Sequence, residues 1–217
     1  MRVGFLLILL LSVPGFAQRY LKAGLSLPQS SATPPYGAVE RALPGFTFGM
    51  AFNRKWSDRM SFRPELVYLQ KGFRFTSSTE QFRVRINYIE VPLLAVFSLS
   101  SHEQPVMIYL EAGPSVGYGL GGKYELRSTP VQSGAVKFGE QPTKSTNDLY
   151  FENPVDIGFQ MGFAFTVTKR WIVDMRYGFG FMSVDEPPNP LPAGRQNSDY
   201  IMKNRVLQFT LGLALGK

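Results

Sequence analysis

Hydrophobic and polar residues alternate strictly between Pro154 and Met182. Apolar side chains occupy every second position from Val155 to Val167, and the positions between them carry small or polar side chains. After the basic pair Lys169–Arg170 the alternation resumes at Trp171. Because successive side chains of a strand point to opposite faces, this pattern predicts two strands. The short polar link between them predicts an antiparallel hairpin.

The two predicted strands are long. Each holds about a dozen residues, whereas strands of soluble proteins mostly hold about 5–6. A tilted strand needs roughly 9–11 residues to cross a bilayer. We therefore expect this hairpin to span a membrane.

The same alternation recurs along most of the chain and predicts eight strands. They cover Arg19–Leu27, Leu43–Asn53, Met60–Phe75, Phe82–Phe97, Val106–Leu120, Val155–Thr168, Trp171–Met182 and Lys203–Gly216. Short links alternate with longer ones, of which residues 28–42, 121–153 and 185–202 are the longest. Outer-membrane barrels have an even number of strands, short periplasmic turns and longer extracellular loops. The predicted fold is therefore all-β, an eight-stranded antiparallel up-and-down transmembrane β-barrel.

Two irregularities are expected within these strands. Pro64 has no backbone N–H to donate, so it is expected at an edge-like position or a bulge. Near Asn87 the apolar residues change parity, which predicts a bulge or the end of the membrane-spanning part.

The two faces of the predicted strands differ in side-chain size. One face is large and apolar, and the other is mostly Gly, Ala, Ser and Thr with a few isolated charges. A soluble lipocalin-like barrel, the alternative, would turn the apolar face inward and expose many Lys and Glu side chains. Small side chains suit the cramped interior of an eight-stranded barrel, and a closed barrel pairs every backbone amide. We therefore predict that the large apolar face contacts lipid.

Charged residues on the small face are then predicted to lie inside the barrel. They are Arg63, Glu65, Glu90, Glu111, Asp156, Asp174 and Arg176. Buried charges must pair, because desolvating a lone charge costs several kcal/mol. We expect a salt-bridged plug, with a proton or ion path as the alternative.

Both tryptophans lie at short links. Trp56 is in the first short turn, and Trp171 directly follows the third. We expect both indole rings at one membrane interface, where such rings are favoured.

The N-terminus has the pattern of a secretory signal peptide. Arg2 precedes an apolar stretch from Val3 to Val13, and small residues stand at Gly15 and Ala17. We expect a signal peptide over residues 1–17 and the barrel domain over residues 18–217. The net charge is +7, but the Lys and Arg residues are scattered, so no nucleic-acid partner is expected.

Little in the sequence points to catalysis. The chain has no Cys, which excludes disulfides, thiol catalysis and thiolate metal sites. His102, the single histidine, lies in a predicted turn and is expected to be solvated. No metal-ligand spacing is present, so we expect neither a cofactor nor an enzyme.

Several motifs carry a resemblance to a known family. Asn87–Leu94 (NYIEVPLL), Glu111–Tyr118 (EAGPSVGY), Arg176–Gly180 (RYGFG) and Asn204–Gln208 (NRVLQ) resemble strands of PorT-like, porin-family β-barrels of Gram-negative outer membranes. The resemblance implies an outer-membrane location, a lipid bilayer environment and insertion by the outer-membrane assembly machinery. Such barrels commonly end on an aromatic residue, whereas this chain ends on Lys217.

The resemblance leaves the task of the protein open. The leading hypothesis is a monomeric barrel that is structural, or that binds a protein partner through its long extracellular loops, with a link to secretion machinery. The alternative is a narrow passive pore for small solutes.

Overall fold

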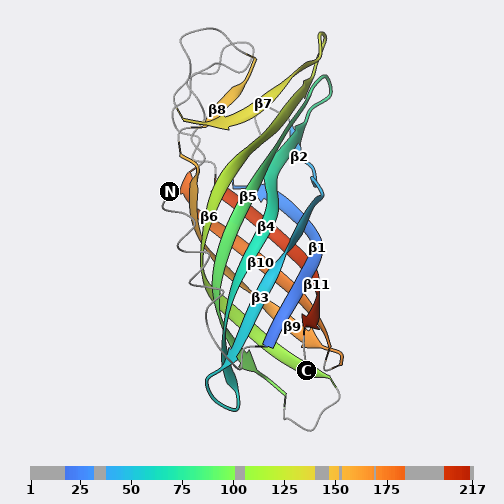
Figure 1. Ribbon diagram of the computed structural model, residues 1–217. Coiled ribbons are helices and arrows are strands. Elements are labelled where there is room, and N and C mark those ends of the chain that lie inside the picture. Colours follow the sequence, from blue (N-terminus) through green and yellow to red (C-terminus); the bar gives the residue numbers. More distant parts are fainter. Residues whose placement is uncertain are drawn as a thin grey trace.

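The computed structural model describes residues 18–31, 38–100, 106–139, 147–151, 153–168, 170–183 and 203–215. The predicted signal peptide, His102 and the predicted loop 185–202 lie outside these residues. Eight long strands form the body of the molecule (Figure 1). They are β1 (Gln18–Ser30), β3 (Gly45–Lys55), β4 (Met60–Thr76), β5 (Gln81–Ser98), β6 (Met107–Arg127), β9 (Val155–Thr166), β10 (Trp171–Ser183) and β11 (Lys203–Leu215).

The eight strands close into a ring. Each pairs antiparallel with its neighbours in the order β1, β3, β4, β5, β6, β9, β10, β11, and β11 pairs again with β1. Leu25 of β1, for example, faces Phe46 on one side and Phe209 on the other. The prediction of an eight-stranded up-and-down barrel is confirmed.

Three short strands lie at one end of the ring, at the top of Figure 1. They are β2 (Val39–Glu40), β7 (Gln132–Phe138) and β8 (Leu149–Phe151). β2 pairs with β4, β7 folds back antiparallel on β6, and β8 lies parallel to β7. The long links predicted over residues 28–42 and 121–153 therefore contain strand segments, which the sequence analysis did not predict. Strand segments in these polar stretches do not line a lipid-facing wall, so they lack the apolar alternation that reveals the barrel strands.

Strands β4, β5 and β6 continue beyond the rest of the ring at this same end (Figure 1). We call this part the extension: residues 70–76 of β4, 81–88 of β5 and 119–127 of β6, together with β2, β7 and β8. A tight turn joins β4 to β5, in which the Ser77 N–H donates to the Glu80 carbonyl at 2.8 Å. We name this end the long-loop end. At the opposite end β3 leads into β4, β5 ends at Ser98, β6 begins at Met107, β9 ends at Thr166 and β10 begins at Trp171, and we name it the short-turn end.

The bulge expected near Asn87 is present. Asn87 faces Gly121 while Tyr88 faces Gly119, which leaves Leu120 as the extra residue on β6. The side chains of β5 nevertheless keep their faces through the bulge, since Val84, Ile86, Tyr88 and Glu90 are all buried. The change of apolar parity arises because the interior itself becomes apolar in the extension.

The expectation that Pro64 lies at an edge-like position or a bulge is wrong, because neither ladder of β4 shifts register around it. β4 lies between β3 and β5, and Pro64 faces Leu93 within the ring. On its other side the pairing with β3 runs through Ala51 opposite Glu65 and resumes with Arg54 opposite Phe62. The proline therefore falls between two paired stretches, where a missing N–H does least damage.

The large apolar side chains face outward all round the ring. Leu25 is 58% exposed, Phe48 51% and Phe163 42%, although each belongs to the interior of a strand. Charged and small polar side chains on the other face are buried. A lipocalin-like barrel has the reverse arrangement, so that alternative is contradicted. The outward band suits hydrocarbon, as the alternation predicted.

No helix in the described part of the chain is long and apolar enough to span a membrane.

Candidate functional site

The most distinctive feature of the barrel is its charged interior. Nine charged side chains are buried among the described residues: Lys22, Arg63, Glu65, Lys71, Glu90, Glu111, Asp156, Asp174 and Arg176. All stand on the inward face of their strands, as the alternation of side chains requires. The structure divides them into two groups that occupy successive levels of the lumen.

Six of them form one group, which we call the ion cluster: Lys22, Arg63, Glu65, Glu111, Asp174 and Arg176. Arg176 Nη2 donates to Glu65 Oε2 at 2.8 Å, and Arg63 Nη2 donates to Asp174 Oδ1 at 3.1 Å. Strands β4 and β10 are four steps apart in the ring of eight, so both contacts cross the lumen. The side chains of the ion cluster therefore extend across the lumen from one wall to the other.

The ion cluster is balanced in charge. Lys22 Nζ lies 2.9 Å from Glu65 Oε1 and 3.0 Å from Asp174 Oδ2. Glu111 contacts Arg63, and its Oε1 lies 3.2 Å from Arg176 Nε. Three cations thus face three carboxylates, and each carboxylate contacts at least two cations. This multiple pairing offsets the cost of removing six charges from water.

A glycine makes room for part of the ion cluster. Gly162 of β9 lies directly between Glu111 and Arg176 in the sheet. A Cβ on Gly162 would lie 2.1 Å from the Met175 carbonyl oxygen and 2.8 Å from Arg176 Cγ. Because Gly162 has no side chain, the Arg176 guanidinium and the Glu111 carboxylate can contact each other across it.

The remaining three charges form the lysine cluster: Lys71, Glu90 and Asp156. Lys71 Nζ lies 2.9 Å from Glu90 Oε2 and 3.0 Å from Asp156 Oδ2. Asn204 Nδ2 also donates to Asp156 Oδ2 at 3.0 Å. Asp156 Oδ1 has no hydrogen-bond partner among the described residues. A small cavity adjoins this cluster, lined by Lys71, Glu90, Ser115, Gly158, Gly178, Phe179, Gly180, Asn204 and Val206.

Gln160 joins the two groups. Its Nε2 donates to Glu90 Oε1 at 2.8 Å, and its Oε1 accepts from Arg176 Nη1 at 3.3 Å. The interior polar contacts therefore run without a break from one cluster to the other.

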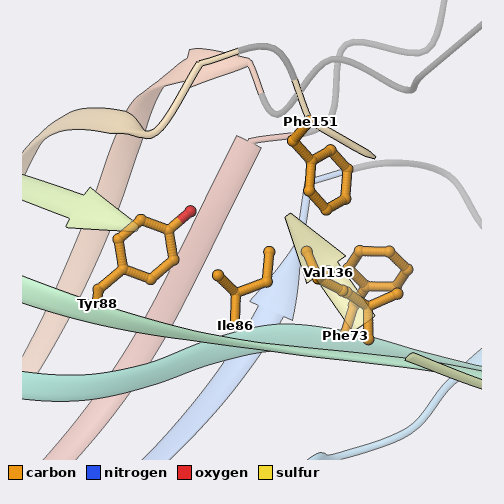
Figure 2. Close-up of a cluster of buried hydrophobic side chains, with 6 residues drawn as sticks. Phe73, Ile86, Tyr88, Val136 and Phe151 are labelled. Atoms are coloured by element: carbon orange, nitrogen blue, oxygen red, sulfur yellow. The ribbon is translucent and has the colours of Figure 1, made fainter. Parts of the chain in front are cut away.

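Above the lysine cluster the interior becomes hydrophobic (Figure 2). We call this part the apolar cluster: Phe73, Val84, Ile86, Tyr88, Val136 and Phe151. Tyr88 marks the junction. Lys71 Nζ lies 5.0 Å from the centre of the Tyr88 ring, and the centre of the Phe138 ring lies 6.5 Å from that of Tyr88 in an edge-on arrangement. The interior thus has three layers, which are the ion cluster, the lysine cluster and the apolar cluster.

The seven charged residues predicted for the interior are all buried there. Arg63, Glu65, Glu111, Asp174 and Arg176 belong to the ion cluster, and Glu90 and Asp156 belong to the lysine cluster. Sequence reasoning missed Lys22 and Lys71. The signal was present, since Lys22 shares parity with Gly24 and Lys71 shares parity with Glu65.

Both tryptophans lie at the short-turn end. Trp56 is in the turn between β3 and β4 and is 83% exposed, whereas Trp171 begins β10 and is 41% exposed. Within the described part of the chain no group of three or more His, Cys, Asp or Glu side chains is placed to hold a metal ion.

On the extension, two exposed ion-pair systems stand outside the ring. Hydrogen bonds from Arg127 and Arg83 lower the pKa of Glu125. A hydrogen bond from Lys137 lowers the pKa of Asp148, and Asp148 Oδ1 also accepts from the Ala135 N–H at 3.1 Å. The second pair therefore ties β7 to the residue before β8.

Two solved structures are similar to this one at low sequence identity. The structure is similar to that of Ail from Yersinia pestis, with 13% identity, a TM-score of 0.46 and coverage of 93% of this chain and 100% of that chain. It is also similar to OprG from Pseudomonas aeruginosa, with 10% identity, a TM-score of 0.47 and coverage of 93% and 97%. A search of curated proteins found no match.

A family model describes most of the sequence. The model for the outer membrane protein beta-barrel domain matches residues 19–186, which include seven of the eight ring strands. The matched family is broader than the PorT-like group. Membership of the PorT-like group stays a prediction. The protein is an integral outer-membrane β-barrel and belongs to the outer membrane protein beta-barrel domain family.

Proposed function

We propose that this protein is a sealed barrel that does not conduct solutes and that anchors and displays the extension at the cell surface. The long-loop end is assigned to the exterior, because outer-membrane barrels carry their short turns on the periplasmic side. Residues 1–17 are proposed as the export signal, and Trp56 and Trp171 as anchors at the periplasmic interface.

The observation that carries the proposal is the pair of contacts across the lumen. Arg176 Nη2 reaches Glu65 on the opposite wall of the ring at 2.8 Å, and Arg63 Nη2 reaches Asp174 on the opposite wall at 3.1 Å. An eight-stranded barrel has an interior that side chains just fill. A solute would have to break these buried ion pairs, and removing one partner of such a pair costs about 3–5 kcal/mol.

The apolar cluster, which lies towards the long-loop end, also supports a sealed lumen. A hydrated ion that entered from the long-loop end would meet Phe73, Ile86 and Phe151, none of which offers it a polar group. It would next meet the lysine cluster, whose only cation is already held by two carboxylates. Two unlike barriers in series argue against the alternative of a narrow passive pore.

A role in display follows from the rigid position of the extension. Its three long strands continue the hydrogen-bond ladders of the ring without interruption apart from one bulge. Segments held on a rigid scaffold are common binding elements. Apolar side chains are exposed at this end as well, including Val39 of β2 at 55% and Val131, in the link just before β7, at 66%. A protein partner at this end is therefore the proposed binding activity, with a link to secretion machinery as its narrower form.

Solute efflux from proteoliposomes tests the sealed lumen. Vesicles that hold the folded protein should release a small neutral sugar and a monovalent salt no faster than protein-free vesicles. Efflux that depends on protein and falls with solute size would instead establish the pore.

A further inference from the structure

The outward face of β4, β5 and β6 changes character in successive cross-strand rows towards the long-loop end. Tyr68, Ile89 and Tyr118 form the last apolar row, since Tyr68 faces Ile89 and Ile89 faces Tyr118. The next row is an amide row, in which Gln70 Nε2 donates to Asn87 Oδ1 at 3.2 Å. This order is the one expected where a wall leaves hydrocarbon and enters the polar interface.

The rows above the amide row are basic. Arg85 directly faces Lys123, and in the next row Arg74 directly faces Arg83. Arg127 stands in the row after that. We call these five residues the basic ladder. Like charges directly opposite each other on adjacent strands are destabilising, so two such pairs in consecutive rows call for a counter-charge.

The protein supplies only part of that counter-charge. Glu125 contacts Arg83 and also holds Arg127. Arg74 and Arg85 donate instead to backbone carbonyls in the segment before β3, the latter from Nη2 to the Pro44 oxygen at 2.9 Å. Within the described residues Arg74, Arg85 and Lys123 have no carboxylate partner, and the Nε atoms of both arginines have no hydrogen-bond partner.

The height of the basic ladder above the lipid-facing band indicates which part of a lipid molecule lies beside it. The Arg85 row lies four residues beyond the Ile89 row, which is about 13 Å along the strand at roughly 3.3 Å per residue. With the usual strand tilt of about 40°, the rise along the membrane normal is about 10 Å. Charged groups at this height above hydrocarbon stand beside lipid headgroups.

We propose that the basic ladder binds the phosphate groups of an outer-leaflet lipid whose acyl chains lie against the apolar rows of β4, β5 and β6. Guanidinium groups bind phosphate oxygens through charge-assisted and often bidentate hydrogen bonds. The ladder and the apolar band share one continuous face, so a molecule with phosphates above acyl chains matches both at once. A soluble polyanion would match the ladder alone. This site lies outside the lumen, so it rests on the proposed exterior position of the long-loop end and not on whether the barrel conducts.

The test uses the whole folded barrel in phosphatidylcholine nanodiscs that contain a minor fraction of diphosphoryl lipid A, a phosphorylated glycolipid. Lipid A that stays bound after partial delipidation is counted by mass spectrometry. The double variant Arg85→Ser/Lys123→Ser should weaken apparent binding roughly 25-fold, because a basic residue near an anionic surface is worth about 1 kcal/mol, or roughly fivefold. Lys123→Ser alone should weaken it roughly fivefold. The Lys123 side chain is exposed and makes no ion pair with any residue that the structure describes.

The matched control is Arg54→Ser/Arg59→Ser, which removes two exposed cations at the short-turn end. This variant should keep lipid A, and lipid A without phosphates should not be retained by any form. Equal retention by wild type and the ladder variants would overturn the proposal, as would an equal loss in the control. A third outcome is that the ladder variants weaken binding of a soluble sulfated polysaccharide but leave lipid A retention unchanged. That result would assign the surface to a polysaccharide and would also overturn the proposal.

Discussion

Arg176 on β10 donates from Nη2 to Glu65 Oε2 on β4 at 2.8 Å, although 111 positions separate the two residues in the chain. Their strands stand on opposite sides of the ring, so this hydrogen bond ties the two walls together through the lumen. It is fully buried, with side-chain exposures of 1% and 0%. The contact gives both buried charges a partner and places their side chains across the lumen, as the proposed sealed barrel requires.

Removing one partner of this contact should destabilise the barrel strongly. Glu65→Gln leaves Arg176 with Glu111 and leaves Lys22 with Asp174 as their remaining carboxylates. The free energy of unfolding should fall by about 3–5 kcal/mol, the usual cost of an uncompensated buried charge. Urea titration of the folded form in lipid vesicles, read by heat-modifiable gel migration, measures this loss. The double variant Glu65→Leu/Arg176→Met should lose less than the sum of Glu65→Leu and Arg176→Met, and strict additivity would count against a coupled pair.

The glycine beside this pair should be intolerant of even one methyl group. Gly162→Ala would place a Cβ against the Met175 carbonyl and the Arg176 side chain. We expect a loss of about 1–3 kcal/mol, typical of overpacking in a filled interior. Gly117→Ala is the matched control, because a Cβ there meets its nearest atom at 3.5 Å, an ordinary contact. The same urea titration should separate the two variants, and equal effects would show that space beside Arg176 is not limiting.

The hairpin of β6 and β7 should respond to acid through Asp148. Because Lys137 lowers the pKa of Asp148, the ionised carboxylate is favoured in the folded state. Its contribution to stability is present above the ordinary carboxyl pKa and is lost as the pH falls through the lowered one. The amide resonance of Ala135, which donates to Asp148, should therefore shift in that acidic window. In Asp148→Asn the shift should vanish, and its persistence would assign the titration to another group.

The two ends of the barrel should differ in accessibility on whole cells. An epitope inserted in the turn between Ser77 and Glu80 extends a tip of the extension, and one inserted in the turn 56–59 extends a short turn. Antibody should label intact cells that carry the first insertion and only permeabilised cells that carry the second. The reverse labelling would invert the proposed orientation and place the basic ladder in the periplasm.

Most of the barrel could be predicted from the sequence because its lipid-facing wall enforces a simple pattern. Phe159, Met161 and Phe163 alternate with Gly158, Gln160 and Gly162, and the structure places the two sets on opposite faces. Arg63 and Asp174 were predicted to lie inside by the same alternation.

The extension could not be predicted from the sequence, because its strands lack the apolar alternation of the lipid-facing wall. Lys123 and Glu125 belong to a paired strand that lies beyond the hydrocarbon, so their side chains need not be apolar and the strand shows no apolar alternation on its outward face. The cross-lumen pairing of Arg176 with Glu65 was also beyond the sequence, because alternation gives the face of a side chain and not its partner across the ring. The alternation would also have placed Lys22 and Lys71 on the inward face. Both were missed because each is a single cation among small side chains.

The most direct test of the sealed lumen is single-channel recording in a planar bilayer, with wild type compared against Glu65→Ala/Arg176→Ala. The wild type should show no conductance steps, because contacts across the lumen and the apolar cluster obstruct the path. The double variant removes the Glu65–Arg176 contact and should show small, brief steps. Sustained conductance by the correctly folded wild type would contradict the account and make the charged interior a conduction path.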